Sequence, residues 1–179
     1  MDFTLSKEHR ALQEKAREFT EQVLFPYEME CEENNGISPE THKYINDQVM
    51  KWGFNATNHS KEHGGTGYTL FEQALISEQL GMSTGAIWDA VPQPSFPMKF
   101  GTKEQIEEYL IPTCQCKRRD AYAITEADAG SDPTQCQTTA VKCDGGYKIN
   151  GEKWYVTVGN IADYLLVHTH LDGDPDKAT

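Results

Sequence analysis

The sequence has little positive charge and no long apolar stretch. Among its 179 residues, 16 Lys and Arg stand against 28 Asp and Glu, and the net charge is −12. A surface that binds nucleic-acid phosphates needs clustered basic residues, and the densest basic run is Lys117–Arg119. No apolar run approaches the roughly 20 residues of a membrane span, and residues 1–5 lack the basic stretch that opens a secretory signal. We therefore expect no nucleic-acid partner and no membrane span.

Cysteine is also scarce. There are five cysteines, an odd number at irregular spacing, which argues against a disulfide framework. Cys114 and Cys116 form a C-x-C pair without a second pair, whereas a structural zinc site needs about four ligands. We expect reduced thiols and no metal site. The compartment would then be the bacterial cytoplasm, or the mitochondrial matrix in a eukaryote.

The first two-thirds of the chain has the pattern of helices. Apolar residues recur at helical spacing over 5–23, with charged residues between them. Ser38 followed by Pro39 predicts the start of a second helix, because Ser caps a helix and Pro suits its first position. Gly53 predicts its end. These signals indicate helices packed through one apolar face.

Two capping boxes predict further helices. Thr69 with Glu72, and Thr102 with Gln105, place a hydroxyl and a carboxylate or amide three residues apart at a helix start. The second of these helices should stop before Pro112, since the residue before proline is disfavoured in a helix.

From about Asp120 the pattern changes to strands and tight turns. Alternating or β-branched segments predict strands at 121–125, 137–143, 153–158 and 164–168. Asp144-Gly145 and Asn150-Gly151 are typical of hairpin turns. We predict an α+β fold, with an N-terminal all-helical domain at 1–118 and an antiparallel, β-barrel-like middle domain at 119–179.

The last residues, 171–179, have the composition of a turn. Strands that end in such a loop leave sheet edges unpaired. We therefore expect the natural polypeptide to extend beyond Thr179 and the β domain to be incomplete at its C-terminus.

The segment 122–132, Y-A-I-T-E-A-D-A-G-S-D, carries the strongest chemical signal. A strand opens into a turn that contains Gly130 and Ser131. Glycine allows a ligand to approach the backbone closely, and a serine hydroxyl with neighbouring amides suits a phosphate. The alternative is an ordinary strand-to-loop turn, which composition alone favours because short glycine motifs are common.

Four segments, in order, resemble the acyl-CoA dehydrogenase family. They are K-E-H-G-G-T-G-Y at 61–68, F-G-T-K-E-Q at 100–105 with Pro112 after it, the segment at 122–132, and Y-K-I-N-G-E-K-W-Y-V-T at 147–157. Ile161-Ala162-Asp163 follows at the expected place. The resemblance covers nearly the whole chain.

The resemblance implies an FAD site in the β domain. The implied contacts are Tyr122, Ile124, Thr125, Gly130, Ser131, Tyr155, Val156 and Thr157. Residues 122–125 would line the isoalloxazine ring, with Thr125 bonding its pyrimidine edge. Gly130 and Ser131 would meet the pyrophosphate, and Ser131 would also touch the acyl-CoA. Residues 155–157 would lie near the reactive face, with Thr157 bonding near N5, a contact that tunes a flavin.

Two positions depart from the family pattern. The family usually has Trp where this chain has Tyr155, which leaves an aromatic ring with less contact area. It usually has Asn-Gly-Gly after the threonine, where this chain has Val158-Gly159-Asn160. The second departure puts the geometry of that turn in doubt.

The implied reaction is α,β-dehydrogenation of an acyl-CoA thioester, in which a base removes the α-proton and the β-hydrogen leaves as hydride to the flavin. The family's base is a carboxylate in a C-terminal helical domain, and we find no catalytic residue for that role in these 179 residues. The chain is therefore interpreted as a fragment that is inactive alone. By resemblance, the partners are an electron-transfer flavoprotein as electron acceptor and further copies in a homotetramer.

Other interpretations stay open. A related flavin oxidase or hydroxylase would share this fold, and so would a non-catalytic relative that keeps it for assembly. His168 and His170 share a strand face at metal-ligand spacing, but a solvated or hydrogen-bonded pair is the favoured interpretation because no third ligand is identifiable. For Glu126 and Asp132 we predict structural roles at the turn.

Overall fold

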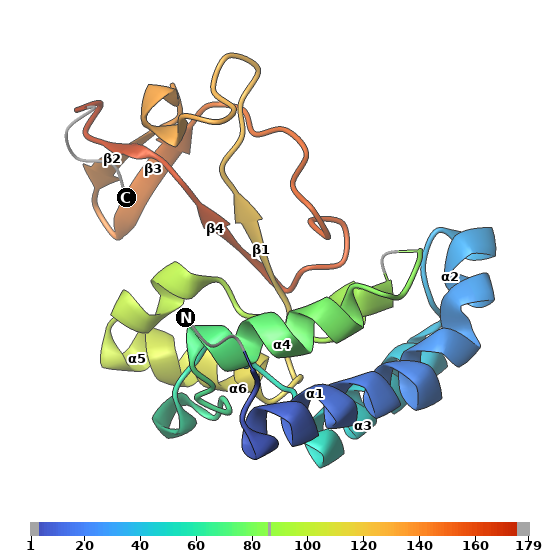
Figure 1. The fold of residues 1–179 in the computed structure, drawn as a ribbon. Coiled ribbons are helices and arrows are strands. Elements are labelled where there is room, and N and C mark those ends of the chain that lie inside the picture. Colours follow the sequence, from blue (N-terminus) through green and yellow to red (C-terminus); the bar gives the residue numbers. More distant parts are fainter. Residues whose placement is uncertain (1–3, 86, 175–179) are drawn as a thin grey trace. The chain divides into compact units, whose positions relative to one another are not determined.

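The computed structural model describes residues 4–85 and 87–174 (Figure 1). The chain divides into two compact units, Met1–Lys117 and Arg118–Thr179. The first is helical and the second is built on strands, which confirms the α+β fold class. Among the helices of these residues, none is long and apolar enough to cross a membrane.

The helical unit begins its helices where the sequence predicts. Its α-helices are α1 (Lys7–Phe19), α2 (Glu28–Asn34), α3 (Pro39–Trp52), α4 (Leu70–Leu80), α5 (Lys103–Gln105) and α6 (Ile111–Cys114). The hydroxyl of Ser38 accepts a hydrogen bond from the N–H of Thr41 at 3.1 Å. Thr69 and Thr102 each form a complete capping box. These three caps satisfy amides that a helix start leaves without partners.

Two helices continue through tighter or wider helical turns. The π-helix η1 (Thr20–Leu24) and the 3₁₀-helix η2 (Phe25–Tyr27) extend α1 into α2. The π-helix η6 (Ile106–Leu110) likewise joins α5 to α6. The predicted stop before Pro112 is therefore wrong. Pro112 lies in the first turn of α6, directly after the π-helix.

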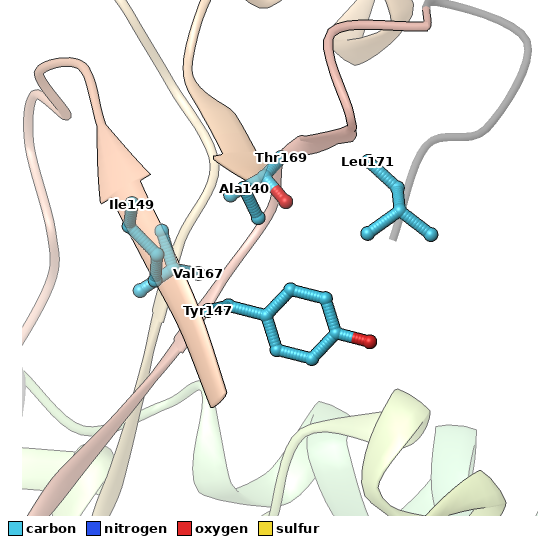
Figure 2. Close-up of a pocket in the computed structure, with 6 residues that line it drawn as sticks. All are labelled: Ala140, Tyr147, Ile149, Val167, Thr169 and Leu171. Carbon is cyan, nitrogen blue, oxygen red and sulfur yellow. The ribbon is translucent and has the colours of Figure 1, made fainter. Parts of the chain in front are cut away.

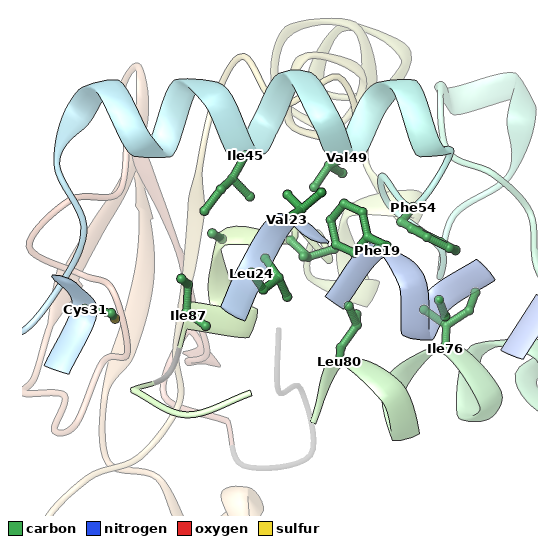
Figure 3. Close-up of a cluster of buried hydrophobic side chains, with 13 residues drawn as sticks. Phe19, Val23, Leu24, Cys31, Ile45, Val49, Phe54, Ile76, Leu80 and Ile87 are labelled. Carbon is green, nitrogen blue, oxygen red and sulfur yellow. The ribbon is translucent and has the colours of Figure 1, made fainter. Parts of the chain in front are cut away.

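The apolar faces of α1 and of its π-helical extension η1 contribute to the core of the helical unit (Figure 3). Ala16, Phe19 and Val23, which the sequence places on one helix face, are all buried. The Phe19 ring contacts the edge of Phe54 with ring centres 5.2 Å apart. Ile45 of α3 is fully buried in the same cluster. Burying each of these large side chains stabilises the fold by about 1.5–3 kcal/mol.

The β unit contains two small sheets. Its strands are β1 (Asp120–Ala123), β2 (Thr139–Cys143), β3 (Gly146–Asn150), β4 (Tyr164–Val167) and β5 (His170–Leu171). One sheet pairs β1 with β4, and the other has the order β3-β2-β5. The hairpin predicted at Asp144-Gly145 joins β2 to β3, which pair antiparallel from Thr139↔Asn150 to Cys143↔Gly146.

Strand direction differs from the prediction elsewhere in the described strands. The pairs β1–β4 and β2–β5 are parallel. Parallel pairing needs a long connection, and residues 124–163 supply one between β1 and β4. The side chain of Asp163 accepts a hydrogen bond from the N–H of Arg119 at 2.7 Å, and its own N–H donates to the Arg119 carbonyl at 2.8 Å. This reciprocal contact holds the start of that pair.

The strand predicted at 153–158 is wrong, and so is the hairpin at Asn150-Gly151. Residues 152–156 follow an irregular path. The backbone N–H of Trp154 bonds to the loop after β1 instead of to a neighbouring strand. In a strand, the Trp154 amide would have bonded to a neighbouring strand. Here it bonds to the Thr125 carbonyl, so a tertiary contact overrides the local strand pattern.

Candidate functional site

The two segments that the sequence singled out lie together in the β unit. The N–H of Trp154 donates to the carbonyl of Thr125 at 2.8 Å. The ammonium of Lys153 donates to the carbonyl of Ile124 at 2.8 Å. The loop that follows β1 is thus joined to the loop that precedes β4 at two successive residues on each side.

A buried ion pair lies beside this junction. Lys153 Nζ is 2.7 Å from Glu126 Oε1, and both side chains are only 8% exposed. Glu126 also accepts hydrogen bonds from the N–H groups of Gln137 and Thr138 and from the Thr138 hydroxyl. These contacts use both carboxylate oxygens. They confirm a structural role for Glu126 at the turn and leave it a poor general base.

The electrostatics of Glu126 follow from those partners. Burial would raise the pKa of its carboxyl group, but the Lys153 ammonium and the hydrogen bonds from Thr138 and Gln137 outweigh it and lower the pKa to about 2. Glu126 is therefore a carboxylate throughout the physiological range. Lys153 was absent from the predicted site residues. Its signal in the sequence is one of the two lysines of the second segment, Lys148 and Lys153.

The turn after Glu126 presents its backbone to solvent. Glu126 and Ala129 exchange two backbone hydrogen bonds, which closes a tight loop before Gly130. Gly130 and Ser131 are exposed, and a methyl group added at Gly130 would meet no atom within 4 Å. Within the described residues, the amides of both have no hydrogen-bond acceptor. Two free adjacent N–H groups on open backbone suit an anion.

Asp132 closes the same turn on its other side. Its carboxylate accepts a hydrogen bond from the N–H of Thr134 at 3.1 Å and caps the 3₁₀-helix η7 (Pro133–Gln135). These hydrogen bonds, first from the Thr134 hydroxyl and then from its amide, lower the pKa of the Asp132 carboxyl group. The structural role predicted for Asp132 is confirmed.

The hydroxyl groups that the resemblance assigns to a flavin are available to a ligand. Those of Thr125, Ser131 and Thr157 make no hydrogen bond to any part of the chain that the structure describes. Tyr122, on β1, exposes 36% of its surface, while Ile124 and Val156 are partly buried. The structure therefore brings the two predicted segments together, and the role of each residue stays a prediction.

The end of the second segment is strained. Tyr155 has φ +54° and Val158 has φ +57°, both left-handed conformations. A β-branched residue is rarely found there, because its Cβ crowds the following carbonyl. The Tyr155 ring is 82% exposed and contacts the edge of Trp154 with centres 5.9 Å apart. Val158 occupies the position where the family pattern has Asn, a residue that adopts this conformation more readily.

Replacing Val158 by Asn should therefore stabilise the β unit. We expect the free energy of unfolding to rise by about 1 kcal/mol, because the left-handed conformation costs a typical side chain about 1–2 kcal/mol. Urea denaturation of both proteins measures it. The matched control is Val141→Asn, the same change at an exposed strand position without positive φ, which should give no gain. A decrease at Val158 would show that the turn is not strained.

The β unit also has an apolar hollow of about 300 Å³, to which β2, β3, β4 and β5 each contribute residues (Figure 2). It is lined by Ala140, Tyr147, Ile149, Val167, Thr169 and Leu171. Its lining includes none of the predicted flavin contacts. The sequence signal for it is the spacing of Tyr147 and Ile149, which share one face of β3.

The metal-ligand candidates have other surroundings. His170 Nε2 lies 3.2 Å from the carbonyl of Thr134, so it is a hydrogen-bonded histidine. His168 Nε2 is buried without a partner in the described residues. None of the five cysteines, all of which lie in the described residues, is in a disulfide. Among residues 4–85 and 87–174, no group of three His, Cys, Asp or Glu side chains is placed to hold a metal ion.

Comparison with known families agrees with this division of the chain. Residues 6–117 match the acyl-CoA dehydrogenase N-terminal domain, and residues 121–179 match the acyl-CoA dehydrogenase middle domain. The fold and the joined loops thus define a helical domain that is followed by a β-sheet middle domain. The chain belongs to the acyl-CoA dehydrogenase family.

Individual relatives show the range of this family. The chain is 32% identical over 177 residues to the short-chain specific acyl-CoA dehydrogenase of Clostridium acetobutylicum, covering 96% of this chain and 46% of the relative. It is 30% identical over 172 residues to the CarC subunit of the caffeyl-CoA reductase-Etf complex of Acetobacterium woodii, covering 93% and 45%. Relatives of this chain thus include a subunit of a complex with an electron-transfer flavoprotein.

Solved structures share the fold. The structure of PigA with FAD and proline superposes with a TM-score of 0.83 at 30% identity, covering 99% of this chain and 48% of PigA. The chain spans about half the length of the curated relatives it matches.

Proposed function

We propose that the protein that contains this chain is an FAD-dependent oxidoreductase that dehydrogenates the α,β bond of an acyl-CoA thioester. The observation that carries the proposal is the junction of the two predicted flavin segments through Trp154, Lys153 and Thr125. That junction gathers free hydroxyl and amide groups in the β unit of a chain from this family. FAD, when bound, supplies the acceptor for the hydride, which carries both electrons of the oxidation.

Each residue has a proposed task. The free amides at Gly130 and Ser131 receive the pyrophosphate charge, since adjacent N–H groups attract anions. The hydroxyls of Thr125 and Thr157 donate hydrogen bonds to the ring system, and Tyr155 contributes its exposed ring to the binding surface. Ser131 also contacts the acyl-CoA.

The α-proton base lies outside the two joined loops in this proposal. Glu126 is paired with Lys153 and bonded to two backbone amides. Asp132 caps the turn that follows it. A general base needs an available carboxylate within hydrogen-bond reach of the proton, and neither residue offers one.

The same proposal includes partners. A relative within an Etf complex supports an electron-transfer flavoprotein as the electron acceptor. We propose a homotetramer for the whole protein, as in the family pattern. The free thiols suit a reducing compartment, either the bacterial cytoplasm or the mitochondrial matrix.

Replacing Ser131 by Asp should weaken FAD binding about tenfold or more. Two like charges 4 Å apart repel by about 1 kcal/mol in water and about 4 kcal/mol near a protein surface, and a factor of ten requires about 1.4 kcal/mol. Titration of the cofactor-free protein with FAD, followed by flavin fluorescence, measures the dissociation constant. The control is Cys143→Asp, which adds the same charge at an exposed position of β2. Equal affinities for the two variants would remove Ser131 from the site.

One observation favours a second function. PigA binds FAD and proline on this fold, so a flavin enzyme with a substrate other than a thioester is the alternative. Anaerobic addition of acyl-CoAs of several lengths, or of free amino acids, separates the two by loss of the oxidised flavin spectrum. No loss with either class would favour the non-catalytic relative.

A further inference from the structure

Lys153 is a cation of the β unit whose side chain is buried and bonded to two groups of a distant loop. Its ammonium contacts the Ile124 carbonyl and the Glu126 carboxylate, partners 29 and 27 residues earlier in the chain. Its side chain is 8% exposed although a lysine at a protein surface normally keeps its charge in water. Two of its three N–H groups are used by these bonds.

Burial of this ion pair is a costly way to stabilise a fold. Removing two charges from water costs several kcal/mol for each ion, and well-packed apolar side chains often serve stability equally well. An apolar pair, however, makes no directional hydrogen bonds. The bond from Lys153 to the Ile124 carbonyl and the bond from Trp154 to the Thr125 carbonyl fix one loop against the other at consecutive residues.

The fixed register reaches the residues of the proposed site. Thr125 follows Ile124 directly, and Thr157 lies four residues after Lys153. The loop that carries Thr125 is fixed at a second place, because the Glu126 carboxylate accepts hydrogen bonds from Gln137 and Thr138. A shift of Lys153 therefore moves the loop that carries Thr125 relative to the loop that carries Thr157. Misplacement of such groups by about 1 Å can cost about a hundredfold in function.

We propose that Lys153 is a positioning residue, which through Ile124 and Glu126 sets the spacing between Thr125 and Thr157 and so the affinity and spectrum of the bound flavin. This inference rests on the proposed function. Lys153 acts through the backbone and the Glu126 carboxylate, without contact with substrate.

The decisive variant is the double replacement Lys153→Met with Glu126→Gln. Methionine keeps the length of the side chain, and the one carbonyl oxygen of glutamine accepts from buried Thr138 in place of Glu126 Oε1, so only the amide of the exposed residue Gln137 loses its acceptor. No unpaired charge stays buried, so the β unit should still fold, with a moderately lower melting temperature than the parent protein. We expect FAD affinity to fall tenfold or more and the visible flavin spectrum to shift. Lys153→Arg, which keeps the charge and the donors, should recover most of the affinity.

Hydrogen exchange of the cofactor-free proteins gives a second measurement. The amide of Trp154, which bonds to Thr125, should exchange at least tenfold faster in the double variant, while the amides of β2 keep their protection. The control is Lys148→Met, the same change at an exposed position of β3, which should alter neither exchange nor FAD affinity.

The outcomes distinguish the positioning role of Lys153 from the proposed function on which it rests. A folded double variant with parental FAD affinity and parental exchange at Trp154 would overturn the positioning role and leave the proposed function standing. A parent protein that binds no FAD would overturn both. Should the double variant fail to fold, Lys153→Met alone takes its place, with the same expected loss of FAD affinity and faster exchange at Trp154, and parental exchange with lost FAD affinity in that variant would contradict positioning through the backbone.

Discussion

Replacing Glu126 by Ala should lower the free energy of unfolding of the β unit by about 3–5 kcal/mol. The change leaves the Lys153 ammonium buried without its partner. It also leaves the amide of the buried residue Thr138 without an acceptor, a desolvation cost of about 1–3 kcal/mol that is included in this range. Urea denaturation, with hydrogen exchange in β2 as the probe for this unit, measures the loss.

The matched control is Asp132→Ala. Asp132 is an exposed carboxylate of the same loop and only caps a short turn, so its loss should cost about 1 kcal/mol. Equal losses for the two variants would contradict the assignment of Glu126 as the anchor of this loop.

Acid titration provides an independent check on Glu126. Its pKa is lowered from an ordinary 4.5 to about 2 in the folded protein. A lowered pKa means that the stabilisation is present above pH 4.5 and is lost as the pH falls toward 2. The loss amounts to about 3 kcal/mol over that window. The Ala variant should lack this component, so the stability difference between parent and variant should shrink as the pH falls from 5 toward 2.

Replacing Gly151 by Ala should lower the free energy of unfolding by about 2–6 kcal/mol. A methyl group at Gly151 would lie 2.7 Å from Thr138 Cα and closer still to its hydroxyl oxygen, and Thr138 is 2% exposed. Gly151 also has φ +151°, a conformation that a side chain resists. Overpacking costs about 1–3 kcal/mol and backbone strain of this kind about 1–3 kcal/mol. The melting temperature and the urea midpoint report the sum.

Gly130→Ala is the comparison for this prediction. A methyl group there meets no atom within 4 Å, and Gly130 is absent from the positive-φ glycines. The change should therefore leave stability unaltered or raise it by about 0.4–1 kcal/mol. A small effect at Gly151 would mean that the loop before Lys153 does not pack against Thr138.

Local signals in the sequence predicted the helical unit well. Ser38, Thr69 and Thr102 each supply a cap through bonds within three residues, and such contacts depend on neighbours in the chain. The Asp144-Gly145 hairpin is equally local. Pro112 misled the prediction because the π-helix before it places it at the start of a new helical segment.

The β unit depends on contacts between distant residues, and there the sequence predicted less. The parallel pair β1–β4 joins residues 120–123 to 164–167, and no local sequence pattern predicts whether two such distant strands pair parallel or antiparallel. Gly151 was taken for a turn residue, yet it serves close packing against Thr138. The two flavin segments were found through family resemblance. The ion pair that joins them was missed, because a lysine and a glutamate 27 residues apart resemble any surface charges.

The flavin content of the purified protein, expressed at the full length of its gene, tests the central claim most directly. After incubation with FAD and removal of the excess, we expect a flavin absorption band at one FAD per chain. This band should be lost or reduced in Ser131→Asp and retained in Cys143→Asp. A folded protein that shows no flavin band after incubation would contradict the proposed FAD site.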